Sequence, residues 1–399
     1  MRIKLAALAV GLCLFCMLTF TIGAQRQVSF GDPLPGLTAD ELARFEDGRD
    51  TFDEITTVDT GLGPVFNNVS CVACHNQPAR GGGSVLTETR YGKTNPDGTF
   101  DPMADLGGSL VHSQGIGTVI GPAGMVCNYV GEHVPTESGA TIRAERRTTP
   151  LFGLGLVDAV PDEEFDKLAR QEMHVDPNTA GRPNRVMNLA TGGITIGKFG
   201  WKAQVPTLLQ FSADAYLNEI GVTSPLFPQE HCPQGNCTLL ACDPTRDPED
   251  HADFLAFADF MMLLAPPARA TERLASEQGE GVFRALGCAS CHVPRLGTGP
   301  SEVRALNHVV FEPYSDFLLH DMGSLGDGIG RQGIATGLEM RTAPLWGLRE
   351  LTTLLHDGRA TSIDQAIPAH DGQGRAARDR FAALDANRKA AVLRFLRSL

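Results

Sequence analysis

The chain of 399 residues is poor in basic side chains, in aromatic side chains and in long apolar runs. It has 34 lysines and arginines against 47 aspartates and glutamates, a formal net charge of −13, and only two tryptophans and four tyrosines. An acidic chain repels the phosphates of nucleic acid and the head groups of anionic lipid, so we expect neither as a partner. The length is sufficient for two domains that each have a core.

A long apolar run occurs at the N-terminus and nowhere later in the sequence. Arg2 and Lys4 precede the run Leu5–Ile22, and small residues follow it up to Ala24. This order is typical of a secretory signal peptide, so we predict that residues 1–24 are removed. An uncleaved membrane anchor is the alternative, because the run is nearly long enough to span a bilayer. After cleavage we expect no contact with the membrane.

Four of the ten cysteines form two copies of one short motif. The copies read Cys71-Val-Ala-Cys74-His75 and Cys288-Ala-Ser-Cys291-His292. C-x-x-C-H attaches c-type haem: the two thiols form thioethers with the macrocycle, and the histidine reaches the iron. We therefore predict two covalently bound haem c groups, with zinc or disulfide chemistry as the alternative. Haem of this type is attached outside the cytoplasmic membrane, so the motifs and the signal peptide both indicate the periplasm.

The other six cysteines lie outside the haem motifs. Cys13 and Cys16 belong to the predicted signal peptide. The remaining four are even in number and belong to an oxidising compartment, so we expect structural disulfides. Four cysteines allow three pairings, and the sequence does not choose among them. These four residues are Cys127, Cys232, Cys237 and Cys242.

An internal repeat extends beyond the haem motifs. Residues 147–154 match residues 341–348, and the stretch from Trp201 to Gln210 matches the stretch from His356 to Gln365. We infer two copies of one haem-binding unit, the first enlarged by loop-rich insertions within 81–195 and 232–242. A proline-containing segment, 264–269, separates the copies. The expected fold is mainly α, with two cytochrome c-like haem domains at residues 25–266 and 267–399.

Local patterns predict helices beside the haem motifs. Residues 38–41 form a capping-box sequence, Thr-Ala-Asp-Glu, which begins a helix. Apolar spacing predicts a helix over about 271–286, directly before the second motif, and a terminal helix over about 385–398. We expect the terminal helix to pack on the 271–286 helix.

Several separate blocks of the chain resemble one family of dihaem proteins. Residues 341–370 are similar to the C-terminal half of bacterial dihaem cytochrome c peroxidases and of the related dihaem enzyme that matures methylamine dehydrogenase. Residues 66–78, 147–164, 197–204 and 320–328 resemble a branch described as dihaem oxidoreductases or peroxidases. The resemblance covers nearly all of the predicted mature chain. It implies a haem-dependent oxidoreductase of the cytochrome c peroxidase type.

The resemblance implies a sixth ligand for the C-terminal haem. In the family this ligand, a methionine or tyrosine, lies fourteen residues after the histidine of an H-D-G turn. Here the turn begins at His356, which places His370 at the ligand position. We predict ligation by His292 and His370, a low-spin iron closed to substrate, and a lower potential than that of a His/Met haem. A surface histidine is the alternative, and Met322 and His320 are weaker candidates.

The equivalent position in the first repeat is Ala215, which cannot bind iron. The resemblance therefore implies that the N-terminal haem, with His75 as its iron ligand, has an open face where peroxide would bind. Trp201 would lie between the haems, and Gln210 and Glu219 would line the peroxide pocket. A carboxyl group can move a proton between the two peroxide oxygens, and an amide can orient the leaving oxygen. Ordinary packing of Trp201 and Gln210, and solvent exposure of Glu219, are the alternatives.

Other residues are weaker candidates. His112 could be a distal ligand that changes with redox state, and Asp158 or Glu163 could serve as the distal acid. Helix capping and solvent contact are the more ordinary roles of these two carboxylates. Relatives also bind a calcium ion between the domains. The backbone around Thr342 and Pro344 could contribute to such a site, but no set of ligands is readable from the sequence.

The expected function is that of a periplasmic dihaem peroxidase-like enzyme. Hydrogen peroxide or another small oxidant would react at the N-terminal haem. Electrons would come from a small periplasmic electron-donor protein through the C-terminal haem and Trp201. One alternative is an enzyme that oxidises a protein or organic substrate through a high-valent haem, and another is an electron-transfer cytochrome with both irons closed. Relatives also suggest a homodimer.

Overall fold

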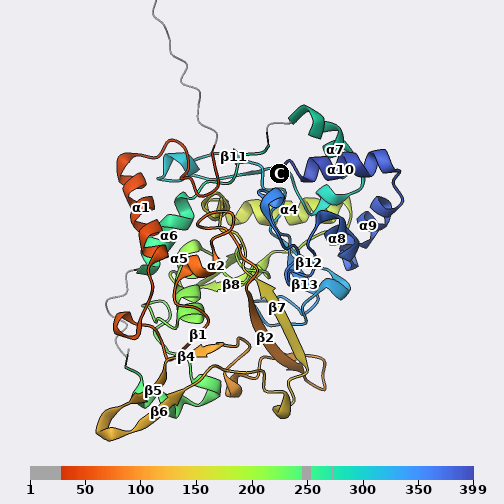
Figure 1. Cartoon of the computed structure of the whole chain (residues 1–399). Coiled ribbons are helices and arrows are strands. Elements are labelled where there is room, and N and C mark those ends of the chain that lie inside the picture. The colour runs from red at the N-terminus through yellow and green to blue at the C-terminus, as the bar shows by residue number, and fades with distance from the viewer. Residues whose placement is uncertain (1–27, 245–252, 271–272) are drawn as a thin grey trace, which may run out of the picture.

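A computed structural model describes residues 28–244, 253–270 and 273–399 (Figure 1). The predicted signal peptide lies outside these residues. Helix exceeds strand in the described chain, as the sequence predicts. A π-helical turn, Tyr216–Ile220, continues α5 without a break. The helices are α1 (Ala39–Asp53), α2 (Cys71–Cys74), α3 (Leu154–Asp158), α4 (Asp162–Val175), α5 (Leu208–Ala215), α6 (Asp253–Leu263), α7 (Arg273–Ala285), α8 (Ile363–Ala366), α9 (Arg375–Ala382) and α10 (Ala386–Leu396).

The strands pair into small antiparallel sheets instead of one layer. The longest pairing joins β2 to β7, with Thr89 opposite Glu145, and β3 lies on the other edge of β2. In Figure 1 this ribbon lies below the helices, and the β5–β6 hairpin projects from the body beside it. The strands are β1 (Val65–Phe66), β2 (Thr87–Thr94), β3 (Phe100–Asp101), β4 (Gln114–Gly115), β5 (Gly117–Ile120), β6 (Val126–Tyr129), β7 (Ile142–Arg147), β8 (Asn184–Asn188), β9 (Gly193–Gly197), β10 (Leu296–Gly297), β11 (Val310–Phe311), β12 (Leu319–Asp321) and β13 (Glu339–Arg341).

In the first half of the chain, α1 packs along α6. The capping box that the sequence predicts is present: Thr38 N donates to Glu41 Oε2 at 2.7 Å, and Glu41 N donates to Thr38 Oγ1 at 3.2 Å. The helices approach closely at Gly48, where a Cβ atom would lie 2.2 Å from the carbonyl oxygen of Ala256. No larger residue fits at that position without a shift of the backbone.

The second half repeats this arrangement with α7 and α10. Phe283 and Phe395 pack with their ring centroids 5.2 Å apart. A Cβ atom at Gly279 would lie 2.1 Å from the carbonyl oxygen of Ala391, so these helices are also in close contact. The predicted packing of the terminal helix on the helix before the second motif is confirmed. In each half, the helix that precedes the haem motif packs on the last helix of that half.

The main hydrophobic core crosses the predicted domain boundary. Phe260 and Leu264, from the end of the first half, are fully buried in the same cluster as Phe317 and Leu318 from the second half. The halves therefore share apolar surface as well as having helix pairs of their own. No helix among the described residues is both long enough and apolar enough to cross a bilayer.

Among the described residues, the four cysteines outside the haem motifs form two disulfides, as expected. Cys127 of β6 pairs with Cys242, and Cys232 pairs with Cys237. The first bond joins residues 115 apart, so it ties the β5–β6 hairpin to the loop that precedes α6. The second closes a short loop.

Equivalent segments of the two halves exchange hydrogen bonds. The backbone N–H of Arg147 donates to the carbonyl oxygen of His356 at 2.7 Å, and that of Arg341 donates to the carbonyl oxygen of Trp201 at 2.8 Å. Each guanidinium then bonds the preceding carbonyl: Arg147 Nε reaches Leu355 O at 2.9 Å, and Arg341 Nε reaches Gly200 O at 2.7 Å. The sequence repeat aligns Arg147 with Arg341 and Trp201 with His356, so the two sets of bonds join equivalent positions.

A buried ion cluster adds a second connection between the halves. Asp327 lies 2.6 Å from Arg146 Nη2 and 2.9 Å from Lys202 Nζ, and all three side chains are at most 1% exposed. Burial raises the pKa of the Asp327 carboxyl, but the charges of Arg146 and Lys202 outweigh it and hold that pKa below its usual value. The carboxylate therefore balances two buried cations.

Replacing this carboxylate should destabilise the protein strongly. We expect Asp327→Asn to lower the free energy of unfolding by about 3–5 kcal/mol, because two cations stay buried with their counter-ion removed. Urea titration of the purified protein measures the change. Asp364→Asn is the matched control: its pair with Arg397 is more than half exposed on both sides, and should cost less than about 1 kcal/mol. Equal losses in the two variants would contradict this account.

Candidate functional site

The second C-x-x-C-H motif lies in a tight turn directly after α7. Cys288 and Cys291 are free thiols, and each is partly exposed. His292 Nδ1 lies 2.9 Å from the carbonyl oxygen of Tyr314. A carbonyl can only accept, so Nδ1 carries the hydrogen and Nε2 keeps its lone pair. Burial lowers the pKa of His292 to about 4, so the imidazole is neutral and able to bind a metal.

His370 faces His292 across a gap of the size that one metal ion requires. The two ring centroids are 6.5 Å apart, with the planes at 60°. His370 Nδ1 is also bonded to a carbonyl, that of Ala366 at 3.0 Å, so its Nε2 also keeps the lone pair. Two metal–nitrogen bonds of about 2.0 Å, plus the distance from each nitrogen to its ring centre, fill such a gap. The geometry fits a single iron between the two imidazoles.

A cavity of about 220 Å³ lies against these residues, and both halves of the chain contribute to its wall. Trp201 and Arg147 come from the first half, and Arg341 from the second. The guanidinium groups of Arg147 and Arg341 are buried and bond carbonyl oxygens, and among the described residues no carboxylate forms an ion pair with either. Two such cations beside one cavity suit the two propionates of a haem. Other lining residues are Cys288, Cys291, His292, His320, Met322, His356 and His370.

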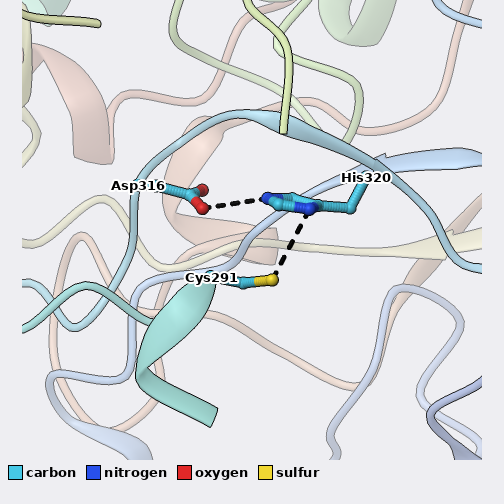
Figure 2. Close-up of side chains that lie close together, drawn as sticks. All are labelled: Cys291, Asp316 and His320. Atoms are coloured by element: carbon cyan, nitrogen blue, oxygen red, sulfur yellow. Dashed lines mark hydrogen bonds and ion pairs between the residues drawn. The ribbon is translucent and has the colours of Figure 1, made fainter. Parts of the chain in front are cut away.

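His320 contacts Cys291 of the second motif, and it does not face His292 as His370 does. Its Nδ1 lies 3.5 Å from Cys291 Sγ, and its Nε2 lies 2.9 Å from Asp316 Oδ2 (Figure 2). Burial acts to lower the pKa of His320, but the charge of Asp316 outweighs it and raises that pKa well above its usual value. A protonated imidazole cannot bind a metal. Cys291, Asp316 and His320 lie close enough together to hold a metal ion, but a protonated His320 is instead a hydrogen-bond donor beside the second motif.

The first C-x-x-C-H motif has the same proximal geometry. Cys71 and Cys74 lie on the single turn of α2, and both thiols are free. His75 Nδ1 lies 2.9 Å from the carbonyl oxygen of Gly82, and burial lowers the pKa of His75 to about 4. The imidazole of His75 is therefore neutral, and its Nε2 keeps a lone pair that can bind a metal, like the Nε2 of His292. Both motifs fit the attachment of a c-type haem.

Two equivalent segments carry His370 and Ala215, the residues at the predicted position of the sixth iron ligand. These segments begin alike and end differently. Thr207 caps α5 by accepting from Gln210 N, and Ser362 caps α8 by accepting from Gln365 N, as the repeat requires. After Ala366 the second segment leaves the α-helix, and His370 follows in extended conformation. In the first segment Ala215 is still helical, and the π-helical turn continues from it. No imidazole stands at that position.

Glu219 lies on this π-helical turn, among buried charges near the first motif. Burial and the neighbouring charge of Glu88, which shares a hydrogen bond with it, raise the pKa of Glu219 to about 8. Burial raises the pKa values of Cys71 and Cys74, and the charge of Glu219 is a smaller contribution in the same direction for both thiols. Asn67 Nδ2 donates to Glu219 Oε2 at 3.0 Å. Glu219 is therefore a partly buried carboxyl that is protonated at neutral pH, and it can pass a proton to a neighbour.

The partners of Glu219 come from the first insertion. Glu88 and Arg90 lie two apart on β2, and Arg90 Nε contacts Glu88 Oε1 at 2.6 Å. Burial raises the pKa of Glu88, but the charges of Arg90 and Arg146 outweigh it, so Glu88 stays ionised. Burial raises the pKa of Asp214, on α5, to about 6. Sequence reasoning missed this cluster; the alternation of Glu88 and Arg90 predicts a shared strand face, but not that this face turns toward a haem.

Two other predicted residues have well-defined contacts. Trp201 Nε1 donates to the carbonyl oxygen of Arg147 at 3.0 Å, and the Trp201 ring lies 6.3 Å from that of His356 at 73°. The Gln210 amide serves the β8–β9 hairpin: Oε1 accepts from Leu189 N at 2.8 Å, and Nε2 donates to Met187 O at 3.2 Å. These bonds are those of a packing residue, so a role for Gln210 toward peroxide stays a prediction.

The weaker candidates have structural contacts. His112 is held by Glu132 and packs against His231. Asp158 accepts from Leu208 N at 3.4 Å, at the start of α5, and Glu163 is exposed on the first turn of α4. Either carboxylate is less suited than Glu219 to proton transfer at the first motif.

The predicted calcium site receives no support from its surroundings. The carbonyl oxygen of Thr342 accepts from Ser315 Oγ at 2.7 Å and from Arg341 Nη1 at 3.1 Å. A cation bound there would face the guanidinium.

The chain belongs to the family described as "Di-haem oxidoreductase, putative peroxidase", whose model matches residues 16–95 and 138–399. A search of curated proteins finds no match. Among solved structures, the chain is similar to hydrazine synthase from Kuenenia stuttgartiensis, at 13% identity and a TM-score of 0.41 over the whole of both chains. It is also similar to a MauG-like protein associated with microbial copper homeostasis, at 15% identity and a TM-score of 0.40 over 94% of each chain. The family match establishes a haem-dependent oxidoreductase.

Removing the imidazole of His370 tests the assignment of the sixth ligand. We expect His370→Ala to convert one ferric haem of the oxidised holoprotein from low spin to high spin, because one strong nitrogen ligand is lost. Electron paramagnetic resonance of the variant measures the change. Met322→Leu is the control, since Met322 lines the same cavity, and its spectrum should match the wild type. A low-spin signal that survives in His370→Ala would assign the ligand elsewhere.

Proposed function

We propose that the chain is a periplasmic c-type dihaem peroxidase, in which hydrogen peroxide is reduced at the N-terminal haem with electrons delivered through the C-terminal haem. The observation that carries the proposal is the difference between two otherwise equivalent sites. His370 faces His292 in the second, whereas Ala215 stands at the aligned position in the first. A site with two imidazoles suits electron transfer, and a site with one suits a reaction with a small molecule.

The cofactors in this proposal are two covalently attached haems. Cys71, Cys74 and His75 would hold the first, and the second would be held by Cys288, Cys291, His292 and His370. When bound, the haem irons supply peroxide binding and electron transfer. The protein supplies the orientation of the imidazoles, the protons and the exclusion of water.

Trp201 is well placed between the two sites. It lies on the wall of the second cavity, and its Nε1 is bonded to the carbonyl oxygen of Arg147. Two residues further along, the backbone of Thr149 contacts the imidazole of His75. Trp201 and this short segment therefore connect the second cavity to the first proximal histidine, as the proposed relay requires.

Glu219 is the proposed proton carrier. Asn67 donates to its Oε2, which leaves Oε1 as the atom that holds the proton. The ionised Glu88 accepts a hydrogen bond from Glu219 and is itself held by Arg90, so this pair holds the protonated carboxyl in place, and the proton that Glu219 gives up is replaced from solvent. A group with a pKa near the working pH can both give and take a proton.

The proposed partners follow from the charge of the molecule. The net charge of −13 favours a small basic electron-donor protein of the periplasm, through complementary surface fields. Export depends on the predicted signal peptide. A homodimer remains a proposal drawn from the resemblance.

Electron paramagnetic resonance before and after one equivalent of hydrogen peroxide tests the proposed function. We expect one high-spin and one low-spin ferric signal from the oxidised holoprotein, with the high-spin signal lost on addition of peroxide. The half-reduced form should be examined in the same way, because reduction can open a site. Two low-spin signals that ignore peroxide in both forms would identify an electron-transfer cytochrome instead.

Peroxide turnover should depend on Glu219 and on pH. We expect Glu219→Gln to lower the rate by about 10²-fold, because the amide cannot release a proton. Since the pKa of Glu219 is raised to about 8, the wild-type rate should fall as the pH rises above that value, and the variant should lose this dependence. Steady-state assays across pH measure both effects. Glu163→Gln, at an exposed carboxylate, should behave like the wild type; equal losses in the two variants would remove the role from Glu219.

A further inference from the structure

Two histidines outside both haem sites, His112 buried and His231 partly buried, lie next to each other with unpaired nitrogens. His112 precedes β4 and is 1% exposed, and His231 precedes the Cys232–Cys237 disulfide. Their ring centroids are 4.4 Å apart, and the planes are tilted by 39°. Both Nε2 atoms are buried, and within the described chain neither has a hydrogen-bond partner. A buried nitrogen without a partner is costly, so two adjacent ones indicate that both share a ligand.

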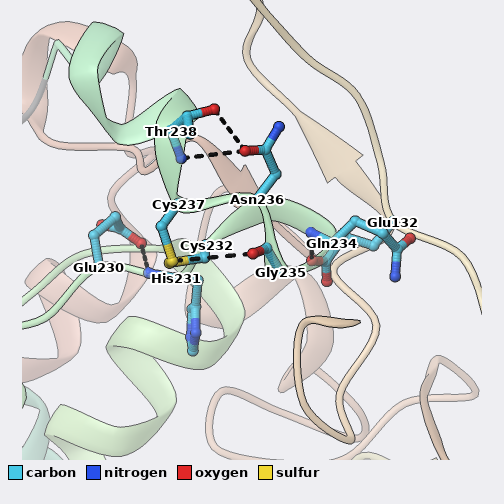
Figure 3. The surroundings of a disulfide bond; sticks show 9 residues. All are labelled: Glu132, Glu230, His231, Cys232, Gln234, Gly235, Asn236, Cys237 and Thr238. Carbon is cyan, nitrogen blue, oxygen red and sulfur yellow. Dashed lines mark hydrogen bonds between the residues drawn. A yellow bond between two sulfur atoms is a disulfide. The ribbon is translucent and has the colours of Figure 1, made fainter. Parts of the chain in front are cut away.

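Glu132 gives His112 the form that a metal ligand has. The carboxylate Oε2 lies 2.6 Å from His112 Nδ1 and also accepts from His112 N at 2.9 Å. Its Oε1 accepts from Gln234 N at 2.6 Å, which ties it to the disulfide loop (Figure 3). Because the carboxylate takes the hydrogen on Nδ1, the lone pair lies on Nε2. Histidines that bind metals almost always have such a partner on the other ring nitrogen.

His231 lies directly before the loop that the Cys232–Cys237 disulfide closes. Its backbone N–H donates to Glu230 Oε1 at 2.7 Å, and its ring points away from the neighbouring disulfide (Figure 3). Burial and the neighbouring His112 lower the pKa of His231 to about 3, so its ring is neutral at physiological pH. A neutral imidazole has a lone pair to donate, and the disulfide restrains the loop that carries it.

We propose that His112 and His231 together bind one divalent transition-metal ion, Zn²⁺ or Cu²⁺, through their Nε2 atoms. Imidazole nitrogen suits both ions. With metal–nitrogen bonds of about 2.0–2.1 Å, imidazoles 90° apart, as in a tetragonal Cu²⁺ site, have ring centres roughly 4.5 Å apart, and those of a tetrahedral Zn²⁺ site roughly 5 Å. The observed separation is 4.4 Å. The 6.5 Å between His292 and His370 is the separation of imidazoles on opposite sides of an ion. Solvent completes the coordination.

The site belongs to this chain's insertion more than to its family. The family model passes over residues 96–137, which contain His112 and Glu132. An ion on His112 and His231 joins that insertion to the loop before α6, beside the Cys127–Cys242 disulfide. The next residue, Ser113, donates through its N–H to Asn67 Oδ1 at 2.9 Å, and Asn67 bonds Glu219. The ion therefore steadies the residues that position Glu219, and its binding does not depend on peroxide chemistry.

Calorimetric titration of the untagged, haem-loaded protein tests the site. After removal of loosely bound metal with a chelator, Zn²⁺ and Cu²⁺ are titrated separately. We expect one equivalent of either ion to bind, Cu²⁺ more tightly, and the thermal unfolding midpoint to rise with it. His231→Gln should abolish both effects, and Glu132→Gln should weaken binding by about 10–100-fold because it acts through His112. His133→Ala, at an exposed histidine of the same loop, should bind like the wild type.

Two results would overturn the proposal. One is the absence of stoichiometric binding by the wild type, which would mean that water satisfies the two nitrogens. The other is unchanged binding in both His231→Gln and Glu132→Gln, which would place the ion elsewhere. If His231→Gln does not fold, the metal affinity of Glu132→Gln is compared with that of His133→Ala. Equal affinities in these two variants would then overturn the proposal.

Discussion

The rest of the structure depends on the exchange of hydrogen bonds between the two equivalent arginine segments. The backbone and the guanidinium of Arg147 bond consecutive carbonyls at 355 and 356, and those of Arg341 bond the carbonyls at 200 and 201. A shift of one residue in either half would break several of these bonds at once. The register of the halves is therefore fixed, and with it the positions of the two residues, Trp201 and His356, that share the wall of the second cavity.

Within this common frame, one proline accounts for much of the difference between the two sites. Pro368 follows α8 and cannot continue an α-helix, because it lacks the N–H that the next turn needs. The helix ends at Ala366, whose free carbonyl is then taken by Nδ1 of His370. That bond turns the other nitrogen of His370 toward His292. The corresponding residue of the first half, Ala213, allows α5 to continue, and the helix brings Glu219 to the first site instead of an imidazole.

Features encoded within a few residues could be predicted from the sequence, and features that depend on distant segments could not. The capping box at Thr38 and the helices before and after the second motif are local patterns, and the structure contains both features. The pairing of Cys127 with Cys242 depends on how an insertion folds back over 115 residues, which no spacing reveals. The same holds for the contacts of Gln210, whose amide bonds the β8–β9 hairpin.

The insertion that makes the first half larger also supplies what its haem site lacks. In the second half the imidazole of His370 lies across from His292, and burial keeps that imidazole neutral. In the first half no such ligand is present, and β2 of the insertion brings Glu88 and Arg90 beside Glu219. Burial makes these charges interact strongly, so one carboxyl must keep its proton while its neighbour is held ionised. The first site therefore has a protonated carboxyl near its C-x-x-C-H motif where the second has an imidazole, and the charge on the added strand helps to keep that carboxyl protonated.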